Sequence, residues 1–198
     1  MAPSPRPWVA LVALLVALVA PPARGWDRNT RTATLSVVNG GSWGFWGHTE
    51  FCPRGAFATG LELKIQPYQG FWGDDTGLNG VLLLCQGGER ITSTVGPFGS
   101  WSRAASCPPG AHLVAFRLEV EAPRGVWDDT AANSLDGLCS DGSHLSPAFS
   151  PRGSLGDWSP TCPPAGGVCG IRTRVDQSRD DIDDTGLNDV QLICCPPL

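Results

Sequence analysis

Six aspartates, placed in three copies of one short motif, are the residues of this chain whose types and spacing could support chemistry. The motif reads Asp-Asp-Thr-x-x-Asn, and each copy reaches a cysteine six residues after its asparagine. Two carboxyl groups on either side of a glycosidic bond, about 5 Å apart for retention or about 6.5–9.5 Å for inversion, can carry out glycosyl transfer. Carboxylate oxygens also bind calcium. The candidate ligand residues are Asp74, Asp75, Asp128, Asp129, Asp183 and Asp184.

A structural role is the alternative for this motif, and its repetition favours that role. Aspartate and asparagine side chains stabilise tight turns through hydrogen bonds to nearby backbone groups. A fold of three equal units needs the turn at every corner, whereas an active site is usually built once. Calcium takes about six to eight oxygens, more than the motif supplies. We therefore expect turns, and we assign no catalytic residue, no metal ligand and no cofactor. Enzymatic activity stays open, as glycosyl transfer.

Several tryptophans lie in the same glycine-rich segments as the motif. Trp72 and Trp127 stand next to the paired aspartates, and Trp46 has a similar setting. Aromatic rings in loops serve as binding anchors, so these three are candidates for contact with a sugar or a protein. The tryptophans that precede the first cysteine of each copy are expected to fill a core layer instead: Trp43, Trp101 and Trp158.

Eight cysteines predict four disulfides, and the repeat predicts their pairing. In each copy one cysteine precedes the closing cysteine by 33, 32 and 32 residues respectively. Equivalent units should pair equivalently, which leaves two cysteines to pair with each other. The predicted disulfides are Cys52–Cys85, Cys107–Cys139, Cys162–Cys194 and Cys169–Cys195. No thiol nucleophile then remains, and the three histidines, His48, His112 and His144, fit no evident catalytic pairing.

The first 25 residues have the features of a secretory signal peptide. A basic residue, Arg6, precedes an apolar run from Trp8 to Ala20, and small residues follow. The run is shorter than the roughly 20 apolar residues that span a bilayer, so we expect secretion and no membrane span. Removal of residues 1–25 would leave 12 basic residues against 19 acidic ones. That balance argues against nucleic acid as a partner, because phosphates require a basic surface.

Residues 26–198 are expected to form one all-β domain. Apolar and polar residues alternate over 60–65, 116–120 and 171–175, and 25 glycines with 18 prolines punctuate the chain. A period of two marks strands with one buried and one solvated face. The internal repeats are placed at about 30–86, 87–140 and 141–195. Each has room for about four short strands, and three such sheets could bury their apolar faces against a shared axis.

The triple motif, the Gly-x-Trp segments before Cys-Pro, and the stretch 115–120 (Ala-Phe-Arg-Leu-Glu-Val) resemble the vitelline membrane outer layer protein 1 family. In the middle copy Ala131-Ala132 replaces Gly-Leu. The resemblance implies a disulfide-stapled β-prism of three four-stranded antiparallel sheets with pseudo-threefold symmetry. It also implies secretion and, for the egg member, a structural place in the outer layer of the vitelline membrane. A mucin and lysozyme are the partners it suggests, and weak transfer of chito-oligosaccharides is associated with the family.

Three functions are therefore weighed. The first is a secreted, monomeric, non-enzymatic structural or interaction protein of an extracellular coat, with mucin-like glycoproteins and lysozyme as partners. The second is a carbohydrate-binding module, and the third is a weak chito-oligosaccharide transferase. Fold class alone does not decide among them.

Overall fold

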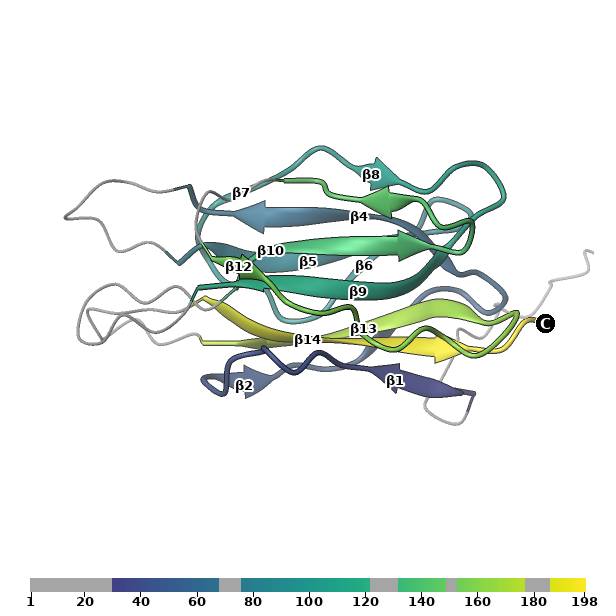
Figure 1. Ribbon diagram of the computed structural model, residues 1–198, viewed down its shortest axis with the longest axis horizontal. Helices are drawn as coiled ribbons and strands as arrows, with labels where there is room; N and C mark the ends of the chain where they lie inside the picture. The colour runs from purple at the N-terminus through teal and green to yellow at the C-terminus, as the bar shows by residue number, and fades with distance from the viewer. Residues whose placement is uncertain (1–29, 68–75, 122–131, 149–152, 177–185) are drawn as a thin grey trace, which may run out of the picture.

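The computed structural model describes residues 30–67, 76–121, 132–148, 153–176 and 186–198. In this part of the chain there are fourteen β-strands and no helix (Figure 1). Among the same residues no helix is therefore available that could cross a bilayer. The all-β prediction is confirmed.

Three long antiparallel hairpins form the centre of the fold. The first strand of each hairpin contains a stretch in which apolar and polar residues alternate, so each hairpin can turn one face inward. In each hairpin the register shifts near both ends, which makes the three closely alike. The hairpins are β4 (Ala58–Ile65) with β5 (Leu78–Cys85), β9 (Leu113–Val120) with β10 (Ala132–Cys139), and β13 (Gly167–Val175) with β14 (Leu187–Cys195).

Short outer strands complete each hairpin to a sheet with four positions. Sheet A has the order β1-β14-β13-β2, with β1 (Ala33–Leu35), β2 (Phe45–Trp46) and β3 (Glu50–Phe51), which also pairs with β13. Sheet B has the order β6-β5-β4-β7, with β6 (Arg90–Thr92), β7 (Ser100–Trp101) and β8 (Ala105–Ser106), which also pairs with β4. Sheet C has the order β11-β10-β9-β12, with β11 (His144–Leu145) and β12 (Ser154–Leu155). The predicted three antiparallel sheets are confirmed. In sheets A and B, two short strands share one edge: β2 and β3 in sheet A, and β7 and β8 in sheet B.

The sheets are displaced along the chain from the predicted repeats. Sheet A joins residues 33–51 to residues 167–195, whereas residues 58–106 form sheet B and residues 113–155 form sheet C. The first predicted repeat, 30–86, is thus divided between sheets A and B. β1 pairs with β14, and β2 and β3 pair with β13, so each edge of the last hairpin has a partner strand from residues 33–51.

The inner faces of the three sheets meet in one core. Strands of different sheets contact one another across it, including β4 with β10 and β5 with β13. Full burial of one large aliphatic or aromatic side chain contributes about 1.5–3 kcal/mol. The largest fully buried side chains come from all three sheets and include Leu35, Leu61, Leu63, Leu83, Phe116, Leu118, Leu135, Ile171 and Leu192.

Four disulfides fasten the ends of the inner strands. They are Cys52–Cys85, Cys107–Cys139, Cys162–Cys194 and Cys169–Cys195, the pairs that the spacing predicts, with Cα–Cα distances of 5.6–5.8 Å. Three of them attach the segment before an inner hairpin to the last residues of that hairpin. On the chain-entropy model each loop of this size stabilises the fold by about 3–4 kcal/mol.

Candidate functional site

In the first copy of the motif, the described residues Thr76 and Asn79 form hydrogen bonds at the base of the turn. Thr76 Oγ1 donates to Gln66 Oε1 at 2.6 Å, and Asn79 Nδ2 donates to Thr76 Oγ1 at 2.5 Å and to the Gly77 carbonyl at 3.3 Å. Asn79 is fully buried. Its amide therefore holds the chain in the turn and is not presented to a ligand, as the turn interpretation requires of this residue.

Eight of the predicted ligand residues lie outside the described residues, and their roles stay predictions: Asp74, Asp75, Asp128, Asp129, Asp183, Asp184, Trp72 and Trp127. The strands on either side of them are described. In the three hairpins, the last paired residues before the motif segment are Ile65–Leu78, Val120–Ala132 and Val175–Leu187. These paired strand ends lie at the left of Figure 1 and define what we call the motif end of the prism.

Exposed apolar side chains gather on the short outer strands at the motif end. Strands β2, β7 and β12 pair with the last residues of β13, β4 and β9, which places all three there. We call the exposed side chains of these strands and their flanks the aromatic rim. Its members, with their exposed fractions, are Trp43 (68%), Phe45 (87%), Phe98 (40%), Trp101 (37%) and Leu155 (50%).

The predicted core layer of tryptophans is wrong. Trp43 and Trp101 belong to the exposed rim, and Trp158 is half-buried against the Arg117 guanidinium on the outer face of sheet C. At Trp43 the cause is the glycine that follows it. Gly44 has φ +75°, and a Cβ there would lie 2.4 Å from the carbonyl carbon of Val175. That close approach brings the backbone against the neighbouring strand, and the flanking side chains then point outward.

Charged side chains on the outer face of sheet C form a partly covered cluster. Arg117 donates to Asp136 Oδ2 from Nε at 3.0 Å and from Nη2 at 2.8 Å, and its guanidinium lies 4.6 Å from the centre of the Trp158 ring. The His144 ring packs against the Trp158 ring at a tilt of 59°, with the ring centres 5.1 Å apart. Burial, and then the nearby Asp136 carboxylate, raise the pKa of Glu119.

This cluster contains two carboxyl groups, but it does not have the access that catalysis requires. The Asp136 side chain is only 8% exposed and is held by Arg117. A substrate could reach it only if that ion pair opened, which is costly for a nearly buried charge. The cluster therefore stabilises sheet C. Among the described residues no group of three or more His, Cys, Asp or Glu side chains could hold a metal ion.

Sheet B balances its outer charges in a similar way. Arg90 forms an ion pair with Glu62, whose side chain is 8% exposed. The alternation of residues 60–65 predicts a solvated position for Glu62, and that prediction is wrong because Glu62 is buried in the ion pair with Arg90. Lys64 donates from Nζ to the carbonyls of Gly96 and Pro97 at 2.8 and 3.1 Å.

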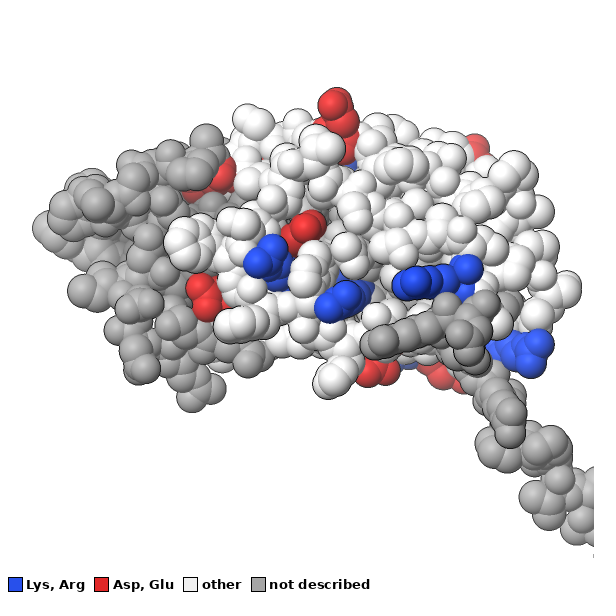
Figure 2. Space-filling model, turned by 90° about the horizontal axis from the view of Figure 1, so that it is seen from below, with Lys and Arg blue, Asp and Glu red and all other residues white. Residues whose placement is uncertain are grey.

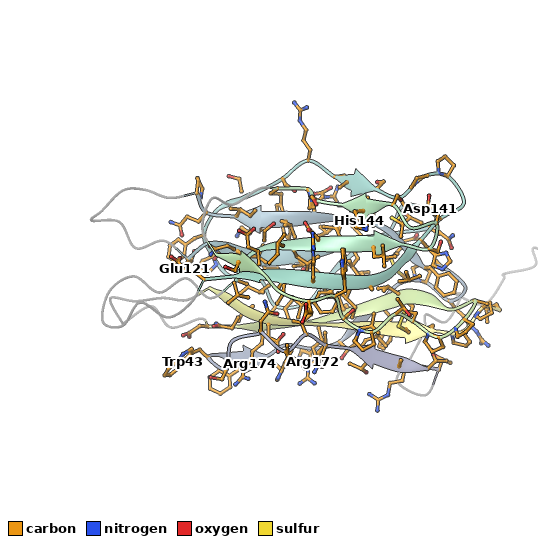
Figure 3. The ribbon with its side chains drawn as sticks, viewed as in Figure 1. Trp43, Glu121, Asp141, His144, Arg172 and Arg174 are labelled. Atoms are coloured by element: carbon orange, nitrogen blue, oxygen red, sulfur yellow. A yellow bond between two sulfur atoms is a disulfide. The ribbon has the colours of Figure 1, made fainter. Side chains whose placement is uncertain are left out.

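Sheet A carries two arginines at its outer face. Arg172 donates from Nε to the Gly47 carbonyl at 3.1 Å, and its guanidinium lies 5.1 Å from the centre of the Trp46 ring. Arg174 donates from Nε to the Gly44 carbonyl at 3.1 Å. Trp46, predicted as a contact residue, is therefore half-buried beneath an arginine. Figure 3 shows Trp43, Arg174 and Arg172 side by side along the lower edge of the molecule.

Comparison with known proteins gives a sequence family and a fold. The family model described as vitelline membrane outer layer protein I matches residues 33–197. A human protein, vitelline membrane outer layer protein 1 homolog, is 46% identical over 174 residues, which cover 85% of each chain.

Solved structures of lectins share the fold at low sequence identity. A prostate-specific WGA16 glycoprotein lectin superposes with a TM-score of 0.55 at 11% identity, covering 80% of this chain and 96% of the lectin. A mannose-binding jacalin-related lectin from Ananas comosus superposes with a TM-score of 0.51 at 14% identity, covering 83% and 97%. At such identities the likeness establishes the β-prism fold alone.

Proposed function

The chain belongs to the vitelline membrane outer layer protein I family, and from that premise we propose that it is a secreted, non-enzymatic protein that binds the glycans of an extracellular coat. The aromatic rim at the motif end is the binding surface. Mucin-like glycoproteins are the class of partner that suits it, because their surface is largely carbohydrate. Residues 1–25 are then the signal peptide, and four disulfides suit a chain that works outside the cell.

The observation that carries this proposal is the exposure of Trp43, Phe45 and Trp101 at one end of a disulfide-fastened scaffold. Large aromatic side chains are usually buried, and a cluster left in solvent marks a place where a partner is expected. An aromatic ring offers a flat apolar surface at small entropic cost, which suits the apolar face of a sugar ring. The disulfide-fastened scaffold fixes the backbone that carries these rings, so little backbone ordering remains for the binding step.

The test is a glycan array followed by calorimetry on the full secreted chain. We expect binding of coat-type oligosaccharides, and we expect Trp43→Ala to weaken it by about tenfold, the loss that corresponds to 1.4 kcal/mol. Leu198→Ala is the matched control, because Leu198 is 77% exposed at the C-terminus, away from the rim. Absence of binding to any sugar at about millimolar concentration would overturn the proposal.

The transferase alternative is tested in the same samples. Chito-oligosaccharides are incubated with the protein, and the masses of the products are measured by mass spectrometry. Products longer than the starting sugar would establish group transfer and contradict the non-enzymatic proposal. Alanine at Asp74, Asp128 and Asp183 would then show which copy of the motif is responsible. Lysozyme stays a separate predicted partner, to be checked by pull-down at low and high salt.

A further inference from the structure

The three sheets differ in charge at positions that the prism makes equivalent. The last polar residue on the long strand before the motif end pairs with an outer strand in every sheet: Lys64 with Trp101, Glu119 with Leu155, and Arg174 with Trp46. Two residues earlier on these strands stand Glu62, Arg117 and Arg172. Only sheet A therefore places two arginines in this pair of positions.

In sheets B and C the earlier residue of this pair of positions forms an ion pair, whereas among the described residues neither arginine of sheet A does. Glu62 pairs with Arg90, and Arg117 pairs with Asp136. Among the described residues no carboxylate oxygen lies within 4.0 Å of Arg172 or Arg174. Asp189 faces Arg174 across the register, and its Oδ1 accepts from the Val190 backbone N–H at 2.7 Å. Burial raises the pKa of Asp189, and the Val190 N–H and the Arg174 charge act against that rise, so Asp189 balances part of the Arg174 charge without forming a close ion pair.

The same corner of the molecule carries the most exposed aromatic side chains among the residues that the structure describes. Trp43 and Phe45 are 68% and 87% exposed, and the carbonyl of the glycine between them accepts the Arg174 hydrogen bond. At the equivalent places sheet B has Phe98 and Ser100 on either side of Gly99, with Phe98 only 40% exposed. Figure 2 shows a row of basic side chains along the face on which β1 and β2 lie.

We propose that this corner, made of Trp43, Phe45, Arg172 and Arg174, binds glycans that carry sulfate or carboxylate groups. The inference rests on the proposed function and names the ligand class of one part of its site. A guanidinium donates two parallel N–H bonds that match an oxyanion. Each Nε is already fixed on a backbone carbonyl, so the planes of the two guanidinium groups are held in place. The adjacent rings would take the apolar face of the sugar.

An anionic ligand is notable for this chain because its formal net charge is −5. Long-range attraction does not bring a polyanion to an acidic protein, so recognition has to come from a local arrangement of positive groups. Two arginines 2 residues apart on one strand face, next to exposed aromatics, provide that arrangement. An acidic peptide would satisfy the arginines but would leave the rings without a flat ligand surface.

The experiment is calorimetry on the full chain with a sulfated N-acetyllactosamine oligosaccharide and its unsulfated counterpart. We expect the sulfated sugar to bind at least about tenfold more tightly, since bonds to a charged group are worth about 1.5–3 kcal/mol. Arg172→Gln and Arg174→Gln should each remove most of this preference without changing the affinity for the unsulfated sugar. Lys64→Gln is the matched control, because it removes one positive charge at the equivalent position of sheet B. Thermal unfolding of each variant verifies that it is folded.

Each alternative result separates this inference from the proposed function. Equal affinity for the two sugars, or an equal loss with Lys64→Gln, would overturn the inference while the proposed function stands. Full competition by polyglutamate would show an acidic-peptide site, and full competition by inorganic sulfate at equal concentration would show a bare anion site. Both of those results would also overturn it. Failure of both sugars to bind would overturn the inference, whereas the proposed function fails only if the glycan array also shows no sugar that binds.

Discussion

The rings of Phe57 and His112 pack against each other with their centres 4.7 Å apart, and Gly167 lies against both rings. These three residues occupy the same place in the three sheets, at the start of β4, β9 and β13. His112 Nε2 lies 3.2 Å from the Gly166 carbonyl, which fixes the ring. There is room at this point for two rings and not for a third, so the third sheet has a glycine.

Gly167→Ala should therefore destabilise the protein. The added Cβ would lie 2.4 Å from His112 Cδ2 and 2.9 Å from Phe57 Cγ, distances at which a ring has to move. Overpacking of this kind costs about 1–3 kcal/mol, measurable as a lowered midpoint of denaturant unfolding. The double variant Gly167→Ala with His112→Ala should lose less than the sum of the two single changes. Strict additivity would show that the contact is not responsible.

Ala165→Gly should stabilise the protein. Ala165 has φ +61°, whereas the equivalent residues of the other sheets are glycines, Gly55 and Gly110, with φ +88° and +87°. A left-handed conformation costs an L-residue about 1–2 kcal/mol, which glycine avoids. Gly110→Ala is the converse test, because a Cβ there would meet nothing within 4 Å and only the backbone cost would appear. A rise in melting temperature for Ala165→Gly and a fall for Gly110→Ala are expected.

Glu119→Gln should stabilise the protein at pH 7 and have little effect below pH 4.5. Burial raises the pKa of Glu119 in the folded state above its ordinary value of 4.5, so the folded protein binds this proton more tightly than the unfolded chain. The resulting stability is complete below the unfolded pKa and is lost as pH rises through the folded pKa. Glu119→Gln has no carboxyl group to ionise at this position, so the variant should not lose this stability as the pH rises. Unfolding measured from pH 4 to pH 7 gives the difference.

Asp141→Asn is the control of opposite sign. Hydrogen bonds from the Ser143 hydroxyl and backbone N–H lower the pKa of Asp141 below its ordinary 3.8. Its stabilising effect is present above that value and is lost as pH falls through the folded pKa. The variant should therefore be less stable than the parent at pH 7 and should approach it at low pH. The same pH trend in both variants would contradict the assignment.

Arg117→Gln should cost more stability than Arg90→Gln. Both arginines pair with a carboxylate whose side chain is 8% exposed, but Arg117 is 25% exposed and Arg90 is 52% exposed. The first change also removes the contact with the Trp158 ring. We expect losses of about 2 and about 1 kcal/mol respectively, reduced at Arg90 by solvent screening. Equal losses in chemical denaturation would show that the tryptophan contact contributes nothing.

Much of the fold could be predicted from the sequence because its signals are local and repeated. Alternation over 60–65 gives β4, and three equal cysteine spacings give three of the disulfides. The division of residues 33–51 and 58–85 between two sheets could not be predicted in this way. A repeat in sequence fixes which strands are equivalent, but it does not say which hairpin an outer strand joins.

The candidate site was less accessible from sequence. The paired aspartates stand out in the sequence because they repeat, yet the described features that differ between sheets are the ones that suggest recognition, such as Arg174 opposite Trp46. Exposure of Trp43 could not be read from its spacing to a cysteine, because Gly44 and the strand it approaches decide which way the side chain points. A signal was present in the shared glycines Gly44, Gly99 and Gly153, all with positive φ.

Closure of sheet A by the first strands sets an order of events during synthesis. Sheets B and C are complete once residue 155 has been made, but β1 has to wait for β14, and the Thr32 hydroxyl reaches a carbonyl 162 residues away. Pairing over such a separation is slow, and the waiting strand edges can associate with other chains. A nascent chain halted before residue 187 should therefore be prone to self-association, and release of the last few residues should end that hazard.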